Sequence, residues 1–327
     1  MKPRKGSLKV NFSEIARELK LSPMTIYRVV NNAPLVKRET RARVIEALNE
    51  HGYYTHKSPR KIKVLFDFTE HPYLKHYGTQ LMRNVAKLNY KCYSTDHRKK
   101  PSAFEDTAAE CDVAVFISIP DDEVIDRIRR INPDIYTITI STRSNADVTI
   151  SPNNTMGGEL VAQHLHAMGH QHIAVHLSAT HPTRMERYKA FYAEMKLLNP
   201  DCRIDQIIEH ENEDTAAVLR NYFASANPKA TALFFLAGAF AEIFLDEFIN
   251  ISKPVLKDIS IITFDRPEDL EYTILKYNFD RVEFVSKDLL DWAEYYITNR
   301  PMMKKRVPVH TSIKVHLVKN GSVRKLN

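Results

Sequence analysis

The 327-residue sequence contains few cysteines and no long apolar segment. Its three cysteines, Cys92, Cys111 and Cys202, lie far apart and lack the short spacings of zinc ligands, so we expect free thiols. No stretch approaches the roughly 20 consecutive apolar residues that cross a bilayer. The N-terminus also lacks the apolar core of a signal peptide. These absences argue against a membrane or exported protein and favour a cytoplasmic one.

Glycine is scarce as well, with eight residues in the whole chain. The sequence has no glycine-rich loop to bind nucleotide phosphates, and it contains neither an H-E-x-x-H nor a G-x-S-x-G motif. Six histidines between His164 and His181 invite a metal hypothesis, but no carboxylate or thiolate joins them at ligand spacing. We therefore predict a protein that is not an enzyme, with no catalytic residues, metal or cofactor.

The charge of the chain is distributed very unevenly. Residues 1–61 hold 14 Lys and Arg against 5 Asp and Glu, a net charge of +9, whereas the remaining 266 residues hold 33 against 35. All of the excess positive charge is therefore confined to the first fifth of the chain. This basic segment is also patterned, which predicts a polyanionic partner rather than a solvated tail.

Apolar residues recur at helical spacing in three parts of the basic segment, which predicts helices over 10–19, 23–30 and 37–51. Ser13 either caps the first helix or lies in its first turn. Ser22 is a good N-cap for the second helix, and Pro23 fits its first position.

The second helix is expected to have a buried and an exposed face. The side chains predicted to be buried are Ile26, Val29 and Val30, and those predicted to be exposed are Met24, Thr25, Tyr27 and Arg28. Two short helices separated by a tight turn, the second one capped and basic, fit the major groove of DNA.

The sequence of this segment resembles the headpiece of the lactose/galactose repressor family. That family reads V-T-x-x-D-V-A-x-x-A-G-V-S-x-x-T-V-S-R-V-L-N, then V-S-x-x-T-R-x-R-V, and ends in G-Y. The matching residues are Val10, Ile15, Ala16, Leu21, Ser22, Thr25, Ile26, Arg28, Val29, Asn31, Thr40, Arg41, Val44, Gly52 and Tyr53. The resemblance implies a helix-turn-helix headpiece over 1–55 that binds double-stranded operator DNA. It further implies a transcription regulator, most often a repressor, that acts as a homodimer on a pseudo-palindromic site.

Carried over position by position, the resemblance implies specific DNA contacts. The base-reading positions are Pro23, Met24 and Arg28, of which Arg28 can make a bidentate contact to guanine. The positions implied to contact phosphates are Ser22, Thr25, Asn31, Thr40 and Arg41.

Two departures from the family pattern have physical consequences. Leu19-Lys20 replaces the Ala-Gly of the turn, so a left-handed backbone at Lys20 would carry a modest energetic cost. Residues 56–61 form a short linker in place of the family's hinge helix, and Pro59 interrupts it. We therefore predict reading of the major groove without a helix wedged into the minor groove.

From residue 62 onward, short apolar runs alternate with amphipathic helical stretches. Strands are predicted over 62–68, 91–95, 113–119, 135–140, 172–178, 232–237 and 259–265, and helices over 77–88, 156–168, 183–197 and 239–248. This alternation predicts an α/β fold with parallel sheets covered on both faces, in two such layers.

The family resemblance continues through 153–158, 164–170 and 258–265. It implies that 62–327 forms a two-lobed, type I periplasmic-binding-protein-like domain for effector binding and dimerisation. The two lobes would be joined by three connections, with an effector cleft between them.

Two residues, Arg187 and Asp265, occupy positions that bind effectors in that family, and Tyr73, which lies where the family has N-P-F-F, is expected to line the same cleft. A structural ion pair between Arg187 and Asp265 is the competing interpretation. Leu236-Ala237-Gly238 replaces the A-N-D sugar contact of the family, which disfavours a common sugar, and Phe240 is a further candidate to line the cleft. Two hypotheses stay open: a regulator controlled by a small-molecule effector, or one with a non-sensing cleft that responds to a protein partner or binds DNA constitutively. An enzyme or transport receptor on the same fold is disfavoured, because catalytic motifs and a signal peptide are absent.

Overall fold

We describe the protein from a computed structural model. The described residues are 11–30, 36–51, 62–68, 72–117, 120, 122–140, 144–178, 182–210, 213–225, 230–249, 259–265, 279–303 and 308–326. Within these ranges, no helix is both long enough and apolar enough to cross a membrane.

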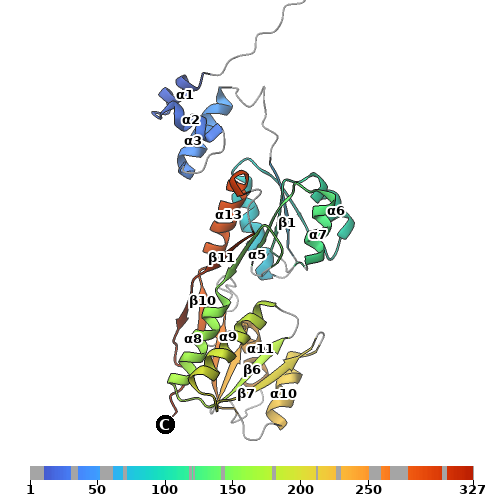
Figure 1. The fold of residues 1–327 in the computed structure, drawn as a ribbon, viewed down its shortest axis with the longest axis vertical. Coiled ribbons are helices and arrows are strands. Elements are labelled where there is room, and N and C mark those ends of the chain that lie inside the picture. The colour runs from blue at the N-terminus through green and yellow to red at the C-terminus, as the bar shows by residue number, and fades with distance from the viewer. Residues whose placement is uncertain are drawn as a thin grey trace, which may run out of the picture. The chain divides into compact units, whose positions relative to one another are not determined.

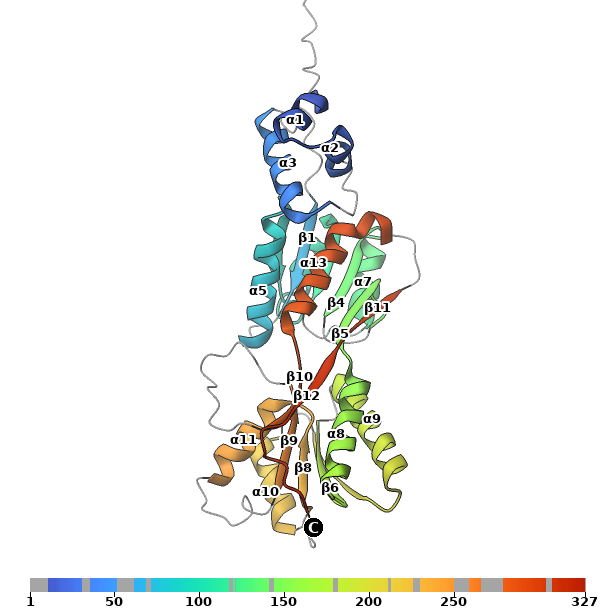
Figure 2. The ribbon, with the colours of Figure 1, turned by 90° about the vertical axis from the view of Figure 1, so that its left-hand side faces the viewer.

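Three short helices form a small core near the N-terminus (Figure 2). They are α1 (Phe12–Glu18), α2 (Pro23–Val30) and α3 (Arg38–Glu50). Their core consists of Ile15, Ala16, Ile26, Val29, Val44, Ala47 and Leu48. The three predicted helices are confirmed, and the second has the predicted bounds. Asn11 caps α1 by accepting a hydrogen bond from the Ser13 N–H at 3.1 Å, so Ser13 lies in the first turn.

The rest of the described chain contains two six-stranded sheets (Figure 1). The strand order is β11-β5-β4-β3-β1-β2 in the first and β12-β10-β9-β8-β6-β7 in the second. The first sheet contains β1 (Lys63–Asp67), β2 (Lys91–Thr95), β3 (Val113–Phe116), β4 (Tyr136–Ile140), β5 (Val148–Pro152) and β11 (Val309–Ile313). The second contains β6 (His172–Ser178), β7 (Arg203–Glu209), β8 (Ala232–Phe235), β9 (Ser260–Phe264), β10 (Asp280–Phe284) and β12 (Val315–Val318).

Both sheets share one topology, in which the first strand along the chain lies between the second and the third. The pairings of β1 with β2 and β3, and of β6 with β7 and β8, are parallel, whereas β12 runs antiparallel to β10. The chain passes from one sheet to the other after β5, after β10 and after β11. These are the three connections that the resemblance implied, and the two-layered α/β prediction is confirmed.

Helices cover both faces of each sheet. They are α5 (Pro72–Ala86), α6 (Pro101–Glu110), α7 (Asp122–Ile131), α8 (Asn154–Ala167), α9 (Pro182–Leu198), α10 (Thr215–Ser225), α11 (Gly238–Ile249) and α13 (Ser286–Met303). In the first sheet α5 and α13 lie on one face and α6 and α7 on the other (Figure 1). In the second sheet α8 and α9 lie on one face and α10 and α11 on the other (Figure 2).

The three cysteines are free thiols, as expected from their spacing. Burial raises the pKa of Cys92 and of Cys111 to about 11, so both are protonated at neutral pH. A protonated, enclosed thiol behaves as a small apolar side chain, which indicates that these cysteines serve packing.

Two glycines allow α8 to pack closely against its neighbours. A Cβ atom at Gly157 would lie 2.1 Å from Cε2 of Phe264, and one at Gly158 would lie 2.4 Å from the backbone oxygen of Arg187. Either substitution would push α8 away from α9 and β9. The glycines of the family-like 153–158 segment therefore set the distance at which Arg187 is held.

A buried carboxylate, Asp280 at the start of β10, ties three distant segments together. Its Oδ2 lies 2.8 Å from Nε2 of His164 in α8. Its Oδ1 accepts the backbone N–H groups of Asn320, Gly321 and Ser322 at 2.7, 2.7 and 3.1 Å. Burial by itself would raise the pKa of Asp280, but these hydrogen bonds outweigh burial and lower the pKa below 3.8. Asp280 thus joins the 164–170 segment, which resembles the family, to the C-terminal segment.

The turn between α1 and α2 contains a left-handed residue, Lys20, with a φ of 55°. This is the conformation that the missing glycine of the family pattern would have supplied. The cost anticipated from the sequence is therefore present in the folded headpiece.

Replacing Lys20 with glycine should stabilise the headpiece by roughly 0.5–1 kcal/mol. A left-handed conformation costs a residue with a Cβ atom about 1–2 kcal/mol, and the greater freedom of glycine in the unfolded chain offsets about half of that gain. Hydrogen exchange at the buried α2 amides of the full chain measures the change. Lys20→Ala is the control, because it removes the same charge but keeps the strain. Equal protection in the two variants would contradict this account.

Candidate nucleic-acid interface and ligand site

The start of α2 is organised by two hydroxyl groups. The Thr25 N–H donates to Oγ of Ser22 at 3.1 Å, so Ser22 caps the helix as predicted. The two hydroxyl oxygens lie 2.9 Å apart, and either can be the donor. Thr25, which was expected to be exposed, is half-buried. One of the two hydroxyl protons is shared between the oxygens, and the other can be donated to an outside acceptor such as a phosphate oxygen.

The outward face of α2 carries the three residues predicted to read bases. Met24 and Tyr27 are 56% and 57% exposed, and Pro23 and Arg28 are exposed as well. Ile26 on the opposite face is fully buried in the headpiece core. A rigid helix therefore presents a cation and apolar surface to solvent on one side.

Helix α3 carries two of the predicted phosphate contacts and also supports the turn. Thr40 and Arg41 are half-buried on this helix. Nη2 of Arg43 donates to the carbonyl oxygen of Leu19 at 3.2 Å, which holds α3 to the turn that precedes α2. Asn31, the remaining predicted phosphate contact, lies outside the described residues.

In the second α/β unit, Arg187 of α9 and Asp265 at the end of β9 form a two-point ion pair. Nη1 lies 2.7 Å from Oδ2, and Nη2 lies 3.3 Å from Oδ1. Arg187 also donates from Nε to Oδ1 of Asn154 at 2.9 Å and from Nη1 to the carbonyl oxygen of Leu236 at 2.7 Å. Its guanidinium carbon lies 3.7 Å from the centre of the Phe264 ring. The protein thus occupies four of the five N–H donors of this buried side chain.

The backbone holds Asp265 in place at an energetic cost. Its φ is 68°, which is uncommon for a residue other than glycine, and its N–H donates to the carbonyl oxygen of Val282 at 2.9 Å. Strained residues of this kind concentrate at binding and catalytic sites. The structure brings Arg187 and Asp265 together, whereas the side chain of Tyr73, the third predicted effector contact, lies outside its described part.

Sequence reasoning missed a neighbouring polar cluster around Phe240. Arg184, in the first turn of α9, has its guanidinium carbon 4.6 Å from the centre of the Phe240 ring, and that ring lies 4.6 Å from the ring of His176. Nε2 of His176 lies 2.9 Å from Oε2 of Glu209, which also accepts the hydroxyl hydrogen of Thr215 at 2.8 Å. Of this cluster, only Phe240 was a candidate from the sequence.

Burial changes the protonation of two members of the cluster. It lowers the pKa of His176 despite the opposing effect of Glu209, so the imidazole is neutral at pH 7 and donates from Nε2. Nδ1 of His176 is buried and has no partner among the described residues. Burial also lowers the pKa of Arg184, and the positive charge of Arg187 adds to that effect.

Four of the six histidines that invited a metal hypothesis, namely His164, His170, His172 and His176, pair with separate partners. Nε2 of His172 lies 2.8 Å from Asp205, just as His176 pairs with Glu209. Both carboxylates come from β7, which runs parallel to β6 in fixed register. These contacts are hydrogen bonds between neighbouring strands of one sheet.

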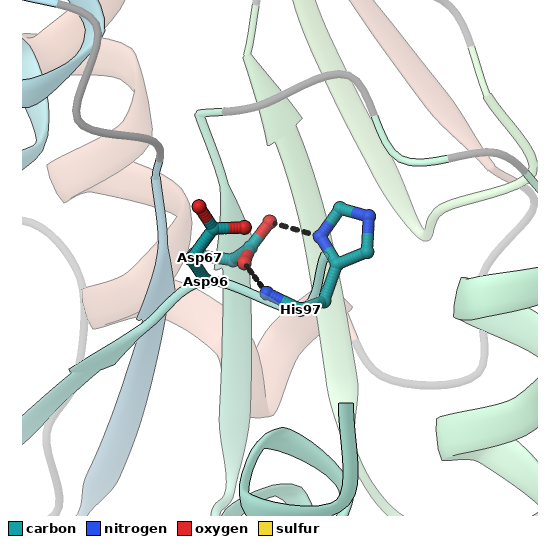
Figure 3. A group of neighbouring side chains, drawn as sticks. All are labelled: Asp67, Asp96 and His97. Atoms are coloured by element: carbon teal, nitrogen blue, oxygen red, sulfur yellow. Dashed lines mark hydrogen bonds and ion pairs between the residues drawn. The ribbon is translucent and has the colours of Figure 1, made fainter. Parts of the chain in front are cut away.

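Within the described ranges, one group of side chains brings potential metal-binding atoms together, namely Asp67, Asp96 and His97 (Figure 3). The backbone N–H of His97 donates to Oδ1 of Asp67 at 2.8 Å, and its Nδ1 lies 2.8 Å from Oδ2. Asp67 ends β1, and the other two residues follow β2. His97 bonds both oxygens of Asp67, so two hydrogen bonds that join the ends of the two strands account for the geometry.

Comparison with known proteins gave matches to both parts of the chain. Residues 11–56 match the model of the family described as bacterial regulatory proteins, lacI family. No curated protein sequence matches the chain.

Solved structures resemble nearly the whole chain. One is the Lac repressor dimer bound to operator and the anti-inducer ONPF (TM-score 0.64, 16% identity, covering 96% of this chain and 99% of that chain). Another is a LacI family transcriptional regulator from Enterococcus faecium with bound ribose (TM-score 0.67, 17% identity, 82% and 100% covered). A third is the transcriptional regulator CelR in complex with cellobiose (TM-score 0.63, 15% identity, 96% and 100% covered). The likenesses confirm the predicted fold, a helix-turn-helix headpiece followed by a periplasmic-binding-protein-like domain.

Proposed function

We propose that this chain is a DNA-binding transcription regulator of the LacI family, and that it is a repressor that binds a pseudo-palindromic operator as a homodimer. The match of residues 11–56 to the lacI family model and the likeness of the fold to the Lac repressor support this proposal. One observation carries the proposal: Arg28 stands exposed on a capped helix whose other face is buried in the headpiece core. The two-fold symmetry of a dimer would place two copies of this helix on two half-sites.

In this proposal α2 enters the major groove. Arg28 makes a bidentate contact to guanine, and Pro23 and Met24 contact the methyl group of thymine. Ser22 and Thr25 donate their available hydroxyl proton to a phosphate at the positive end of α2. Thr40, Arg41 and Asn31 are the remaining proposed phosphate contacts.

The linker limits how the headpiece engages DNA. Residues 56–61 lie outside the described residues. Their number and Pro59 support a proposal in which base reading occurs in the major groove, without a hinge helix that unstacks bases in the minor groove.

Repression can be tested with a promoter that carries a bound site upstream of a reporter gene. We expect reporter output to fall when the chain is expressed and to recover with Arg28→Ala. Sedimentation of the protein with DNA should give two chains per site. Increased output, or one chain per site, would overturn the repressor or the dimer respectively.

We further propose that a small-molecule effector binds around Arg187, Asp265 and Tyr73. Ligands of parallel α/β sheets bind outside the carboxyl ends of the strands, where Asp265 follows β9 and Leu236 follows β8. Two of the similar regulators were solved with ribose and with cellobiose. These observations support a hydroxylated small molecule.

The hydrogen bonds of Arg187 also favour a second function, in which the cleft senses no small molecule. Because the protein itself satisfies four donors of Arg187, the ion pair also suits a structural role. The chain would then bind DNA constitutively or answer to a protein partner.

A thermal-shift series against sugars, sugar acids, nucleosides and amino acids separates the two functions. A ligand at 100 times its Kd stabilises the folded state by about 2.7 kcal/mol, which raises the Tm by several degrees. The effector account expects at least one such ligand, with binding weakened about tenfold or more in Asp265→Asn, since a hydrogen bond to a charged group contributes about 1.5–3 kcal/mol. Circular dichroism controls for folding. If no compound raises the Tm, the constitutive or partner-controlled function replaces the sensing one.

A further inference from the structure

We propose that the effector is an oxyanion, a hydroxylated small molecule bearing a carboxylate or phosphate group that Arg184 binds. The inference rests on the proposed small-molecule function and adds the chemical class of the ligand. It is carried by the surroundings of Arg184, which differ sharply from those of Arg187 three residues later.

Arg184 is a half-buried cation whose hydrogen-bond donors lack acceptors among the described residues. Its guanidinium stacks on the ring of Phe240, with 4.6 Å from the guanidinium carbon to the ring centre. No hydrogen bond or ion pair to another described residue satisfies its five N–H groups. A planar guanidinium held flat on an aromatic ring keeps its N–H edge free for a carboxylate or phosphate.

Two carboxylates act on the charge of Arg184, and both hydrogen-bond to other side chains. Asp265 uses both oxygens on Arg187. Glu209 uses Oε2 for His176 and Thr215. Both lie close enough to act on the charge of Arg184, but neither accepts a hydrogen bond from it. The charges of the two guanidinium groups and the two carboxylates therefore balance, but the N–H donors of Arg184 have no acceptor among the described residues.

Three effects disfavour a guanidinium without a hydrogen-bonded anion at this position, and the charges of Glu209 and Asp265 oppose them only in part. Burial removes part of the water that would solvate the guanidinium, and Arg187 adds a like charge. Arg184 also lies in the first turn of α9, where the positive end of the helix dipole opposes a cation. A bound oxyanion would relieve all three and satisfy the donors. Arg187, one turn further along α9, and its partner Asp265, which follows β9, would face the hydroxyl groups of the same ligand.

The test compares the full chain with Arg184→Gln and with Lys189→Gln. Lys189 is an exposed cation on the same helix, so its replacement removes the same charge away from the cluster. The probes are inorganic phosphate, gluconate, glucose 6-phosphate and neutral glucose. Calorimetry gives the Kd, and thermal shift the Tm, for each protein with each probe, and sodium chloride keeps the ionic strength constant.

We expect at least one of the three anions to bind the wild type and Lys189→Gln with the same Kd, and Arg184→Gln at least about tenfold more weakly. No response to any of the three anions, or equal responses in all three proteins, would overturn the inference. Binding of glucose that is unchanged by Arg184→Gln, without binding of the anions, would leave the effector function standing and remove only its anionic class. If a wider ligand series also fails, the proposed effector function fails with it.

Discussion

Replacing Arg28 with alanine should lower affinity for the selected operator by roughly 30-fold or more, because each bidentate contact to guanine contributes about 1–3 kcal/mol and a dimer makes two. Binding to random duplex should change far less, because phosphate contacts supply that affinity. Arg28 is exposed and α2 is held by its cap and by the headpiece core, so the fold should survive. Fluorescence anisotropy with operator and random duplexes measures both affinities.

Arg41→Ala is the matched control for that experiment. It removes one positive charge from α3, where the proposed contact is to phosphate. Affinity should fall by a similar factor on every duplex, and the slope of log K against log salt should flatten by about one for each phosphate that is no longer neutralised. If Arg28→Ala instead lowers specific and random binding equally, Arg28 does not read a base.

Replacing Asp280 with alanine should destabilise the second α/β unit by about 3–5 kcal/mol. The change leaves the buried side chain of His164 and three backbone N–H groups without their acceptor, and each lost hydrogen bond to a charged group costs about 1.5–3 kcal/mol. Chemical unfolding followed by circular dichroism measures the free energy. Asp201→Ala is the control, because Asp201 is exposed and should change stability by no more than about 0.5 kcal/mol. Similar losses in both variants would show that Asp280 does not tie these segments together.

The same carboxylate predicts how stability depends on acid. Because the folded pKa of Asp280 lies below 3.8, the unfolded chain binds a proton first as the pH falls. Its contribution is therefore complete well above the ordinary aspartate pKa, begins to fall at about pH 5, and is lost as the pH falls through the lower, folded pKa. Asp280→Asn should lack that part of the acid sensitivity, and an unchanged acid profile in this variant would contradict the assignment.

The headpiece could be predicted almost completely because its signals are local. Helical spacing located Ile26 and Val29 in the core, and Ser22-Pro23 marked the start of α2 at its observed residue. The left-handed backbone at Lys20 could be predicted because the family pattern has a glycine at this position. The cap of α1 was less certain, because Ser13 and Asn11 are equally suitable residue types.

Five strands were missed, and for all but β5 (Val148–Pro152) their position or composition explains why. Strand β7 (Arg203–Glu209) is an edge strand with mostly exposed or half-buried positions, and β11 and β12 are edge strands too. Such strands lack the continuous apolar run that identified β6 and β8. Strand β10 (Asp280–Phe284) lies inside its sheet, but its charged residues are buried because they pair with one another and with distant segments.

The ligand site was predicted only where a family pattern marked it. Arg187 and Asp265 were found through resemblance, and their 78-residue separation carries no local signal. The partners of the histidines followed another rule, since His172–Asp205 and His176–Glu209 are both separated by 33 residues. In the β6–β7 register His172 lies opposite Arg203 and His176 opposite Ile207, so each histidine bonds the carboxylate two residues further along β7, on the same face of the sheet. That offset depends on a pairing between strands, one of which the sequence did not reveal. Arg184 was missed because its distinguishing property, donors without acceptors among the described residues, exists only after folding.

The central claim is that the headpiece reads DNA sequence through α2, and selection of bound duplexes from a random library tests it most directly. We expect the purified full chain to enrich an inverted repeat in which one guanine per half-site loses its preference in Arg28→Ala and keeps it in Arg41→Ala. Enrichment of no common sequence, or of one whose guanine preference survives in Arg28→Ala, would contradict the account.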